Sequence, residues 1–498
     1  MKRLLRTEFI FLVVLFLGLF AMAARNVTDP DLWWHLKTGQ YIAEHHSVPR
    51  TDPFSYTRAG QLWVTHEWLT ELLLYQIHRI AGWGGLIVIF SAVLAATFWF
   101  LYLRCGPASY VAGVATLCAA WATAPVWGVR PQVLSLFLTS LWLLVLERSE
   151  NNAKLLWWTL PLTLLWVNLH AGFALGLALS ALFLAGEWME YRLCRASPAS
   201  GQRLKTAARI FFLDLLLVPL NPNGLRLFTY PVETLRSAAM QNYIAEWASP
   251  NFHHAEYWPL LGVLLGTFAV LWWSRRPVRL RDLFLLVVSL YAALCSIRLT
   301  PVFVLIAVPL LAKRLGNWPK VRPGLTQPHA AARVVLNTGI VLAMAAFAGI
   351  HIGRVIQRQP QAETRNFPAG AVAFLSTHTV PGPIFNHYDW GGYLIWKLYP
   401  STRVFIDGRA DLYEKQLLDQ FADTYQFKGD WQRTLQRWAI GTVLLPRDSA
   451  LATGLRSDPG WSVSYEDAQA VVLTATDRLQ GAELSLDSAA IPDYANKP

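Results

Sequence analysis

The chain has 498 residues, of which 54% are hydrophobic and only 15% are charged. Soluble domains carry about 25% charged residues, so this composition excludes an ordinary soluble globular protein and indicates a membrane protein. The formal net charge is +11, but the Lys and Arg residues lie in turns between apolar runs, which membrane topology explains better than a nucleic-acid-binding face. We therefore expect membrane lipid as a partner and no nucleic acid.

The hydrophobic residues gather in runs that carry few or no charges. A helix needs about 20 apolar residues to cross about 30 Å of hydrocarbon, and most runs reach that length with their flanks. The runs cover residues 9–24, 86–103, 111–126, 133–146, 155–167, 173–184, 210–220, 259–273, 283–297, 301–312 and 334–350. The sequence thus predicts a multi-pass α-helical membrane protein of about 11 transmembrane helices.

The first apolar run permits two interpretations. Lys2, Arg3 and Arg6 precede it, and Ala21-Met22-Ala23 ends it, a pattern typical of a cleaved signal peptide. Because the run is slightly long for a signal peptide and many spans follow, an uncleaved first helix is the simpler interpretation.

The basic residues indicate which side of the membrane each turn occupies. If the N-terminus is in the cytoplasm and successive spans cross in alternate directions, the basic turns fall on the cytoplasmic side, as the positive-inside rule requires. These turns hold Arg104, Arg148, Lys154, Arg192, Arg195, Arg203, Lys205, Arg275, Arg276, Arg279, Arg281, Lys313, Arg314, Lys320 and Arg322. The outer side receives the loop 25–70, three short turns, the loop 221–257 and everything after His351. Any chemistry is therefore expected on the outer side.

The residues after about position 366 change in character. Short β-like runs at 383–385, 403–406, 442–445 and 470–473 alternate with helical runs at 369–377, 414–425 and 431–438. This alternation predicts a small C-terminal α/β domain on the outer, periplasmic side. We expect a transmembrane domain at 1–352 with an outer first loop at 25–70, an extracytoplasmic α/β domain at 366–478 and a disordered tail at 479–498.

The first outer loop carries the acidic residues that point most directly to chemistry. Asp29 and Asp31 form an Asp-x-Asp pair immediately outside the first helix. Such carboxylates can bind a divalent cation and a diphosphate, or one can act as a general base while the other tunes it. The alternative is that an Asp after the turn residue Pro30 caps a helix. Where the loop returns to the membrane, Glu67 beside His66 is either a ligand or a first-turn acidic residue of a helix.

Isolated basic residues and a histidine occupy other outer turns. Arg130 and Arg298 each stand alone on the side that the positive-inside rule depletes, which favours binding of an anion such as a lipid phosphate over simple snorkelling. His170 lies in a turn so short that it must be at the membrane surface, where a lone His is more often structural than functional.

Two polar stretches follow β-like runs in the C-terminal domain. His387, Tyr388 and Asp389 follow the first, and Asp407 and Arg409 follow the second. Polar residues at strand ends are where α/β domains build sites, although Gly residues beside both stretches also suit turns. Together these residues predict a substrate-binding site that faces the membrane.

In their order and shared side, these features resemble the GT-C glycosyltransferases, which use polyprenyl-phosphate-linked sugar donors. The catalytic subunit of oligosaccharyltransferases is the nearest parallel, because its first-loop Asp is followed by an aromatic pair and by a helix ending in Glu-His. This chain has a similar order at a similar spacing, with Asp31 followed by the pair Trp33 and Trp34 and then by Glu44 and His45. The resemblance implies that Asp31 is the catalytic, metal-coordinating Asp.

The motif that opens the soluble domain of that subunit, WWDYG, is similar to residues 387–391, with His387 and Tyr388 replacing its Trp pair. Because that pair helps to read the acceptor sequon, the resemblance does not imply asparagine-linked transfer. The order of motifs along the whole chain, including Thr51-Asp52-Pro53, also resembles a widespread bacterial group of GT-C-like membrane proteins.

The expected function is transfer of a sugar from a polyprenyl phosphate or diphosphate to an unidentified acceptor at the outer face of the bacterial inner membrane. Asp31 would be the general base or metal ligand with Asp29 assisting, and Arg130 or Arg298 would neutralise the leaving phosphate. His35, His66, Glu67 and His170 would assist at the substrate, with the polar residues of the C-terminal domain.

Two alternatives stay open for the cofactor. One is a divalent cation, Mg²⁺ or Mn²⁺, held by Asp31 and Glu67, and the other is no cofactor, because some members of the fold that this chain resembles work without a cation. The four Cys residues lack CxxC spacing, so no zinc site is predicted. Two alternatives to glycosyl transfer are a transporter or flippase of lipid-linked glycans and a non-catalytic envelope assembly protein.

Overall fold

The computed structural model describes residues 7–107, 109–193, 198–274, 277–316 and 330–476. The predicted tail 479–498 and several basic residues assigned above lie outside these ranges, namely Lys2, Arg3, Arg6, Arg195, Arg275, Arg276, Lys320 and Arg322. The chain divides into two compact units. The first comprises Met1–Arg50 and Val64–Ala362, and the second comprises Thr51–Trp63 and the chain from Glu363 onward.

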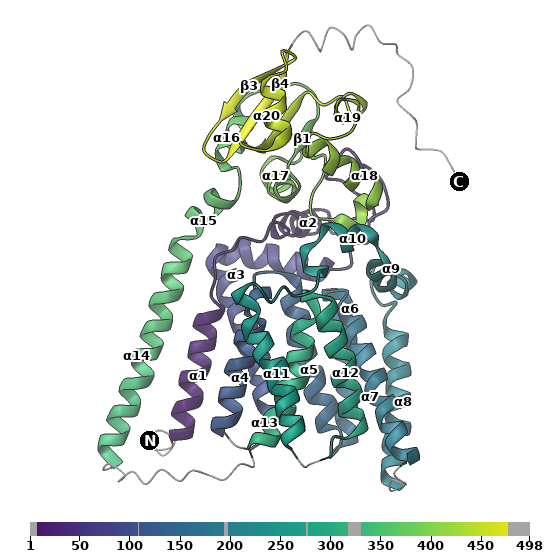
Figure 1. The fold of residues 1–498 in the computed structure, drawn as a ribbon, viewed down its shortest axis with the longest axis vertical. Helices are drawn as coiled ribbons and strands as arrows, with labels where there is room; N and C mark the ends of the chain where they lie inside the picture. The colour runs from purple at the N-terminus through teal and green to yellow at the C-terminus, as the bar shows by residue number, and fades with distance from the viewer. Residues whose placement is uncertain (1–6, 108, 194–197, 275–276, 317–329, 477–498) are drawn as a thin grey trace. The chain divides into compact units, whose positions relative to one another are not determined.

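The first unit is helical. Its longer helices run side by side in a bundle (Figure 1). The helices are α1 (Thr7–Ala23), α2 (Leu32–His45), α3 (Trp68–Arg104), α4 (Ser109–Thr123), α5 (Pro131–Arg148), α6 (Thr159–Leu169), α7 (Phe173–Leu193), α8 (Pro198–Leu217), α9 (Tyr230–Arg236), α10 (Ala238–Tyr243), α11 (Trp258–Trp273), α12 (Leu280–Cys295), α13 (Thr300–Leu315) and α14 (Ala330–Gln357).

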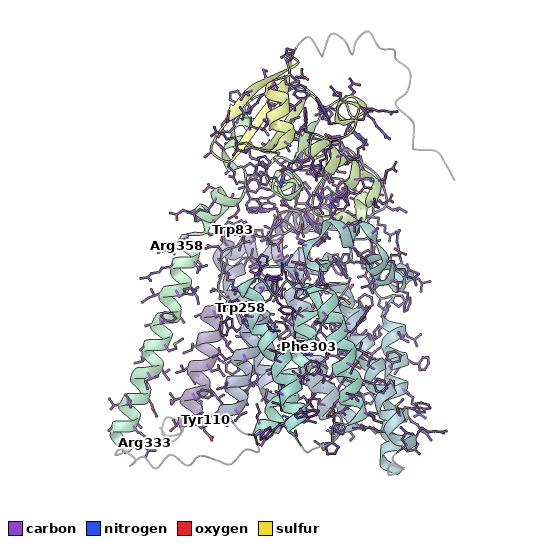
Figure 2. All side chains as sticks on the ribbon, viewed as in Figure 1. Trp83, Tyr110, Trp258, Phe303, Arg333 and Arg358 are labelled. Carbon is purple, nitrogen blue, oxygen red and sulfur yellow. The ribbon has the colours of Figure 1, made fainter. Side chains whose placement is uncertain are left out.

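Helix α13 lies at the centre of this bundle, because its residues are buried almost without interruption from Thr300 to Ala312. Figure 2 shows Phe303, which has no exposed surface, within the bundle. Helix α14 packs on α1, and Arg333 lies near its start and Arg358 directly after its end (Figure 2). Cations at both ends of an apolar helix suit the two surfaces of a membrane.

Among the described residues, five helical segments are long and apolar enough to cross a membrane. They are Trp68–Arg104, Ser109–Val126, Phe173–Leu193, Ala255–Trp273 and Ala332–Gln357. Other predicted spans fall on shorter helices, such as α6 with 11 residues and α12 and α13 with 16 each. The structure therefore supports a helical membrane protein, and the total of about 11 spans stays a prediction.

A break at Gly82 divides α3 into two parts. Its φ of +56° belongs to the left-handed region, which glycine adopts without steric cost. Helix α3 packs closely on α2, where a Cβ atom at Gly39 would lie 2.0 Å from the carbonyl oxygen of Glu71. This close approach of α2 to the first part of α3 brings their polar side chains together.

The second unit has a four-stranded sheet. Its strands β1 (Ile384–Asn386), β2 (Thr442–Pro446), β3 (Trp461–Glu466) and β4 (Ala470–Ala475) have the order β1-β2-β4-β3. Strands β1 and β2 are parallel, and the other neighbours are antiparallel. The helices of this unit are α16 (Ala369–Thr377), α17 (Gly391–Leu398), α18 (Ala410–Tyr425), α19 (Trp431–Arg437) and α20 (Ala450–Arg456), and α15 (Gln359–Asn366) crosses the boundary between the two units.

Residues 51–63 of the predicted first outer loop, 25–70, belong to this second unit, whereas the whole loop was predicted to be part of the transmembrane domain. The segment closes on itself through a bridge between Thr51 and Leu62 and attaches to the domain through a parallel bridge between Ser55 and Val404. The predicted β-run 403–406 is therefore not a strand of the sheet, because Val404 pairs with the loop instead.

Candidate active site

The Asp-x-Asp pair lies at the start of α2. The backbone N–H of Asp31 donates to Oδ1 of Asp29 over 2.9 Å, which fixes the two carboxylates relative to each other. The indole N–H of Trp34 donates to Oδ1 of Asp31 over 3.2 Å. Although Asp31 occupies the N-cap position, its side chain makes no capping hydrogen bond. The helix-capping alternative therefore does not account for Asp31.

Arg130 connects this pair to two other segments. It precedes α5 with extended backbone, and its Nε lies 2.6 Å from Oδ2 of Asp29. Its Nη1 forms an ion pair with Glu246. Burial lowers the pKa of Arg130, but the charges of Asp29 and Glu246 outweigh burial and raise it above its usual value. Arg130 is thus a cation held between two carboxylates.

Arg298 lies against the segment that carries Glu246. The hydroxyl of Ser296 donates to the carbonyl oxygen of Glu246 over 2.9 Å. The Arg298 guanidinium lies 5.6 Å from the ring centre of Trp247, a cation–π contact. Within the described residues Arg298 forms no ion pair, so its charge is less compensated than that of Arg130.

The Asp31 carboxyl is half-buried, and protein groups enclose it. Burial raises its pKa, and the negative charge of Asp29 raises it further. The charges of His35 and Arg130 and the hydrogen bond from Trp34 act in the opposite direction. The result is a pKa of about 7, at which the carboxyl can exchange a proton near neutral pH.

Glu67 is the centre of a histidine cluster that joins three segments. Its Oε1 lies 2.9 Å from Nε2 of His66 and 3.3 Å from Nε2 of His170, and its Oε2 lies 3.6 Å from Nε2 of His35. Burial opposes ionisation of Glu67, but the neighbouring imidazoles lower its pKa below the usual value. Nδ1 of His35 lies 3.3 Å from Oε1 of Glu71, one helical turn after Glu67.

The hydrogen bonds around His170 determine its tautomer. The backbone N–H of Gly172 donates to Nδ1 over 2.8 Å, and the Ser135 hydroxyl lies 2.8 Å from the same nitrogen. Nδ1 is therefore an acceptor, which assigns the proton to Nε2, the nitrogen facing Glu67. Burial lowers the pKa of His170 to about 3, so the ring is neutral at physiological pH.

The predicted residues of the C-terminal domain fall into two groups. His387 lies 5.2 Å from the ring of Trp390 and 5.3 Å from that of Tyr425, and burial lowers its pKa despite the nearby charge of Asp389. Tyr388 is half-buried and Asp389 is exposed. These three residues stay predictions for substrate binding.

Asp407 and Arg409 have a different position from the one predicted. Asp407 is fully buried, Arg409 is 2% exposed, and neither presents a surface to a substrate. Nε and Nη2 of Arg409 bond the two oxygens of Asp407, and Nη1 bonds Asp52. The predicted binding role is corrected to attachment of the loop 51–63, because every side-chain nitrogen of Arg409 is already engaged.

Several partners in these clusters were not predicted from the sequence. Glu246 was not proposed for the site, although it lies beside Trp247 in the predicted outer loop 221–257. Glu71 carried a detectable signal, because residues four apart on a helix share a face and Glu67 was already a candidate. Asp52 gave no comparable signal, since its partner Arg409 is distant in sequence.

The predicted divalent cation would have two carboxylate ligands, Asp31 and Glu67. No group of three or more His, Cys, Asp or Glu in the described residues has positions suited to a metal ion. Both oxygens of Asp29 and Oε1 of Glu67 already contact protein donors. The divalent cation therefore stays a prediction.

The fold is similar to that of two solved membrane proteins, AglB and ArnT, which are GT-C glycosyltransferases. The Archaeoglobus fulgidus oligosaccharyltransferase AglB, in complex with an inhibitory peptide and a dolichol-phosphate, is similar with a TM-score of 0.56 and 12% sequence identity, over 88% of this chain and 69% of that one. The oligosaccharyltransferase of the same organism in its apo form gives 0.55 and 12%, over 89% and 70%.

ArnT from Cupriavidus metallidurans in the apo state is similar with a TM-score of 0.52 and 14% identity, over 94% of this chain and 97% of that one. No protein-family model and no curated protein matches the chain. At sequence identities of 12–14%, the similarity to these structures shows the fold alone.

Proposed function

We propose that the protein transfers a sugar from a polyprenyl phosphate or diphosphate to an acceptor at the outer face of the bacterial inner membrane. One observation carries the proposal. A carboxyl with a pKa of about 7, that of Asp31, shares a cluster with the cation Arg130, in a chain with the GT-C fold. The similar AglB structure contains a dolichol-phosphate, a lipid of the proposed donor class.

Asp31 acts as the general base in this proposal. Its Oδ1 accepts the Trp34 hydrogen bond, so Oδ2 receives the proton of the acceptor hydroxyl or amine. The acceptor atom bonds to the anomeric carbon of the sugar while the carbon–oxygen bond to phosphate breaks. The electron pair of that bond stays on the phosphate oxygen. A base with a pKa near the working pH combines a useful ionised fraction with sufficient basicity.

The two outer arginines have different roles. Arg130 is compensated by Asp29 and Glu246, so its main effect is to position Asp29 beside Asp31. Arg298 forms no ion pair among the described residues, although its charge does act on Glu246, and it is the better ligand for the phosphate that leaves. Electrostatic stabilisation of such a developing charge is commonly the largest single contribution to a rate.

The histidine cluster around Glu67 positions α2. His35 lies between Glu67 and Glu71 and belongs to the same helix turn as Asp31 and Trp34. The proposed topology has a cytoplasmic N-terminus and a periplasmic C-terminal domain, with His387, Tyr388 and Asp389 as candidate acceptor-binding residues.

The test uses the full chain reconstituted in liposomes with a polyprenyl phosphate that carries a radiolabelled hexose. Wild-type protein should release polyprenyl phosphate and transfer the label to material from an envelope extract. Asp31→Asn should lose this reaction, whereas Asp448→Asn, which alters an exposed carboxylate of the second unit, should keep it.

The same assay separates the alternatives. Movement of the label across the bilayer without cleavage would support a flippase and contradict the proposal. Binding of envelope proteins with neither cleavage nor movement would support an assembly protein. Equal turnover by Asp31→Asn and wild type would remove Asp31 from the mechanism.

A further inference from the structure

The second unit contains a polar cavity of its own. Its volume is about 410 Å³, which is within the range of small-molecule sites. The loop 51–63 and the helices α18 and α19 supply its walls. The polar side chains that line it are Thr57, Arg58, Gln61, Gln416, Gln420 and Arg437.

The cavity differs in chemistry from an ordinary apolar pocket. Its remaining walls are Leu417 and Trp438. Each of the three glutamine amides both donates and accepts hydrogen bonds, as paired sugar hydroxyls also do. The flat apolar face of an indole suits the C–H face of a pyranose ring, and only one aliphatic side chain is present to hold an apolar group.

The charges in the cavity are positive. Among the described residues no Asp or Glu lines it, and the cations that line it are Arg58 and Arg437. Arg437 lies 5.7 Å from the Trp438 ring and forms no ion pair within the described part of the chain. Arg58 donates to Oε1 of Gln61 over 3.0 Å and to the carbonyl oxygen of Tyr413 over 2.5 Å. Among the described residues, its one ion-pair partner, at 3.6 Å, is the mostly exposed Glu414. The Nε atom of Arg58 is buried with no hydrogen-bond partner.

Contacts behind the cavity hold its walls in place. The Thr57 hydroxyl donates to the carbonyl oxygen of Phe405 over 2.6 Å. Trp438 packs against Tyr56 and Phe405, and its indole N–H lies 3.4 Å from Oε1 of Gln420. This contact leaves the N–H₂ group of Gln420 to donate to a ligand. A site whose walls are already ordered loses less entropy on binding.

We propose that this cavity binds an acidic saccharide, one whose sugar ring carries a carboxylate. The carboxylate would lie at Arg437 and Arg58, the hydroxyls at the glutamine amides and the ring face on Trp438. An acidic peptide would match the charges but would leave the amide groups and the indole face without matching partners. All residues of this site belong to the second unit, so the proposal does not depend on the proposed sugar transfer.

The test measures binding to the full-length protein in nanodiscs by saturation-transfer NMR and isothermal titration. The probes are trigalacturonate, the neutral maltotriose and the peptide triglutamate. Trigalacturonate should bind more tightly than both. Arg437→Gln should weaken its binding about tenfold or more, as expected when a charge-assisted contact is lost. Gln416→Ala should weaken it by a smaller factor.

Matched controls come from the same helix outside the cavity. Arg433→Gln and Gln436→Ala change residues of α19 that do not line it, and both should bind trigalacturonate like wild type. Absence of trigalacturonate binding would overturn the proposal. Equal binding of triglutamate, or equal losses in the Arg433 and Arg437 variants, would also overturn it, because binding would then follow charge alone.

Discussion

Nη1 of Arg409 donates a hydrogen bond of 2.7 Å to Oδ1 of Asp52, although 357 positions separate the two residues. The other guanidinium nitrogens bond both oxygens of Asp407, and the Tyr413 hydroxyl donates to the same carboxylate. All of these side chains are buried. The loop 51–63 is therefore attached to the second unit by an ion cluster from which water is excluded.

Removal of this arginine should destabilise the second unit. Arg409→Leu leaves Asp52 and Asp407 buried without a cation, which costs about 3–5 kcal/mol when one partner of a buried ion pair is lost. Thermal unfolding followed by tryptophan fluorescence should show a lower midpoint, and proteases should cleave within residues 51–63 more readily. Arg456→Leu, which removes a more exposed pair with Glu466, should change the midpoint much less. Equal effects of the two variants would contradict the structural role of Arg409.

The activity should depend on pH through Asp31. Its folded pKa is raised to about 7, mainly by burial, so the carboxyl is protonated and inactive as a base at lower pH. The value of kcat/KM should rise up to about pH 7 and then level off, and at pH 5 it should be about 100-fold below the plateau. Because a raised carboxyl pKa favours the neutral form in the folded state, the stability contribution of Asp31 is present below about pH 4 and is lost as pH rises through about 7.

A second variant tests whether ionisation of Asp31 causes this rise of kcat/KM with pH, the rising limb of the pH profile. Asp29→Asn removes a negative charge that raises the Asp31 pKa, so the rising limb should move to lower pH. The pH profile of kcat/KM for this variant measures the shift. A limb that stays in place, or moves upward, would show that another group is the base.

The two outer arginines should give different kinetic effects. Arg298→Gln removes the less compensated cation and should lower kcat by about 10²–10³-fold, the usual loss when a donor to a developing anion is removed. Arg130→Gln leaves the Asp29 and Glu246 carboxylates without their cation, so the Asp31 pKa should rise and the pH limb should move upward. Measurement of donor turnover by each variant across pH 5–9 distinguishes the two roles. Identical profiles for both variants would contradict the separate roles.

The close contact of α2 with α3 should be intolerant of a methyl group. Gly39→Ala would place Cβ 2.0 Å from the Glu71 carbonyl oxygen, so α2 must move and carry His35 away from Glu67. We expect about 1–3 kcal/mol of destabilisation from overpacking, together with loss of turnover. Gly262→Ala in α11 meets no atom within 4 Å and is the matched control. Equal unfolding midpoints and rates for both variants would show that the contact is unimportant.

Local patterns in the sequence were sufficient for the class of protein and for part of the candidate site. Uninterrupted apolar runs predict membrane helices because the cost of burying charge in hydrocarbon applies to each run separately. Asp29 and Asp31 could be singled out for the same reason, since two carboxylates in a short outer turn form a local motif. Glu67 and His66 are likewise adjacent in the chain.

Only the tertiary structure decided which of these residues act together. The sequence treated Arg130 and Arg298 alike, whereas packing gives Arg130 two carboxylate partners and Arg298 a tryptophan face. Asp407 and Arg409 resembled a site at a strand end, yet their burial against Asp52 makes them structural. Such pairings depend on how distant segments pack, and neither hydrophobic periodicity nor residue spacing contains that information. The sequence by itself determined a helical membrane protein and predicted polar groups gathered on one side of it, and the fold determined which of these groups are partners.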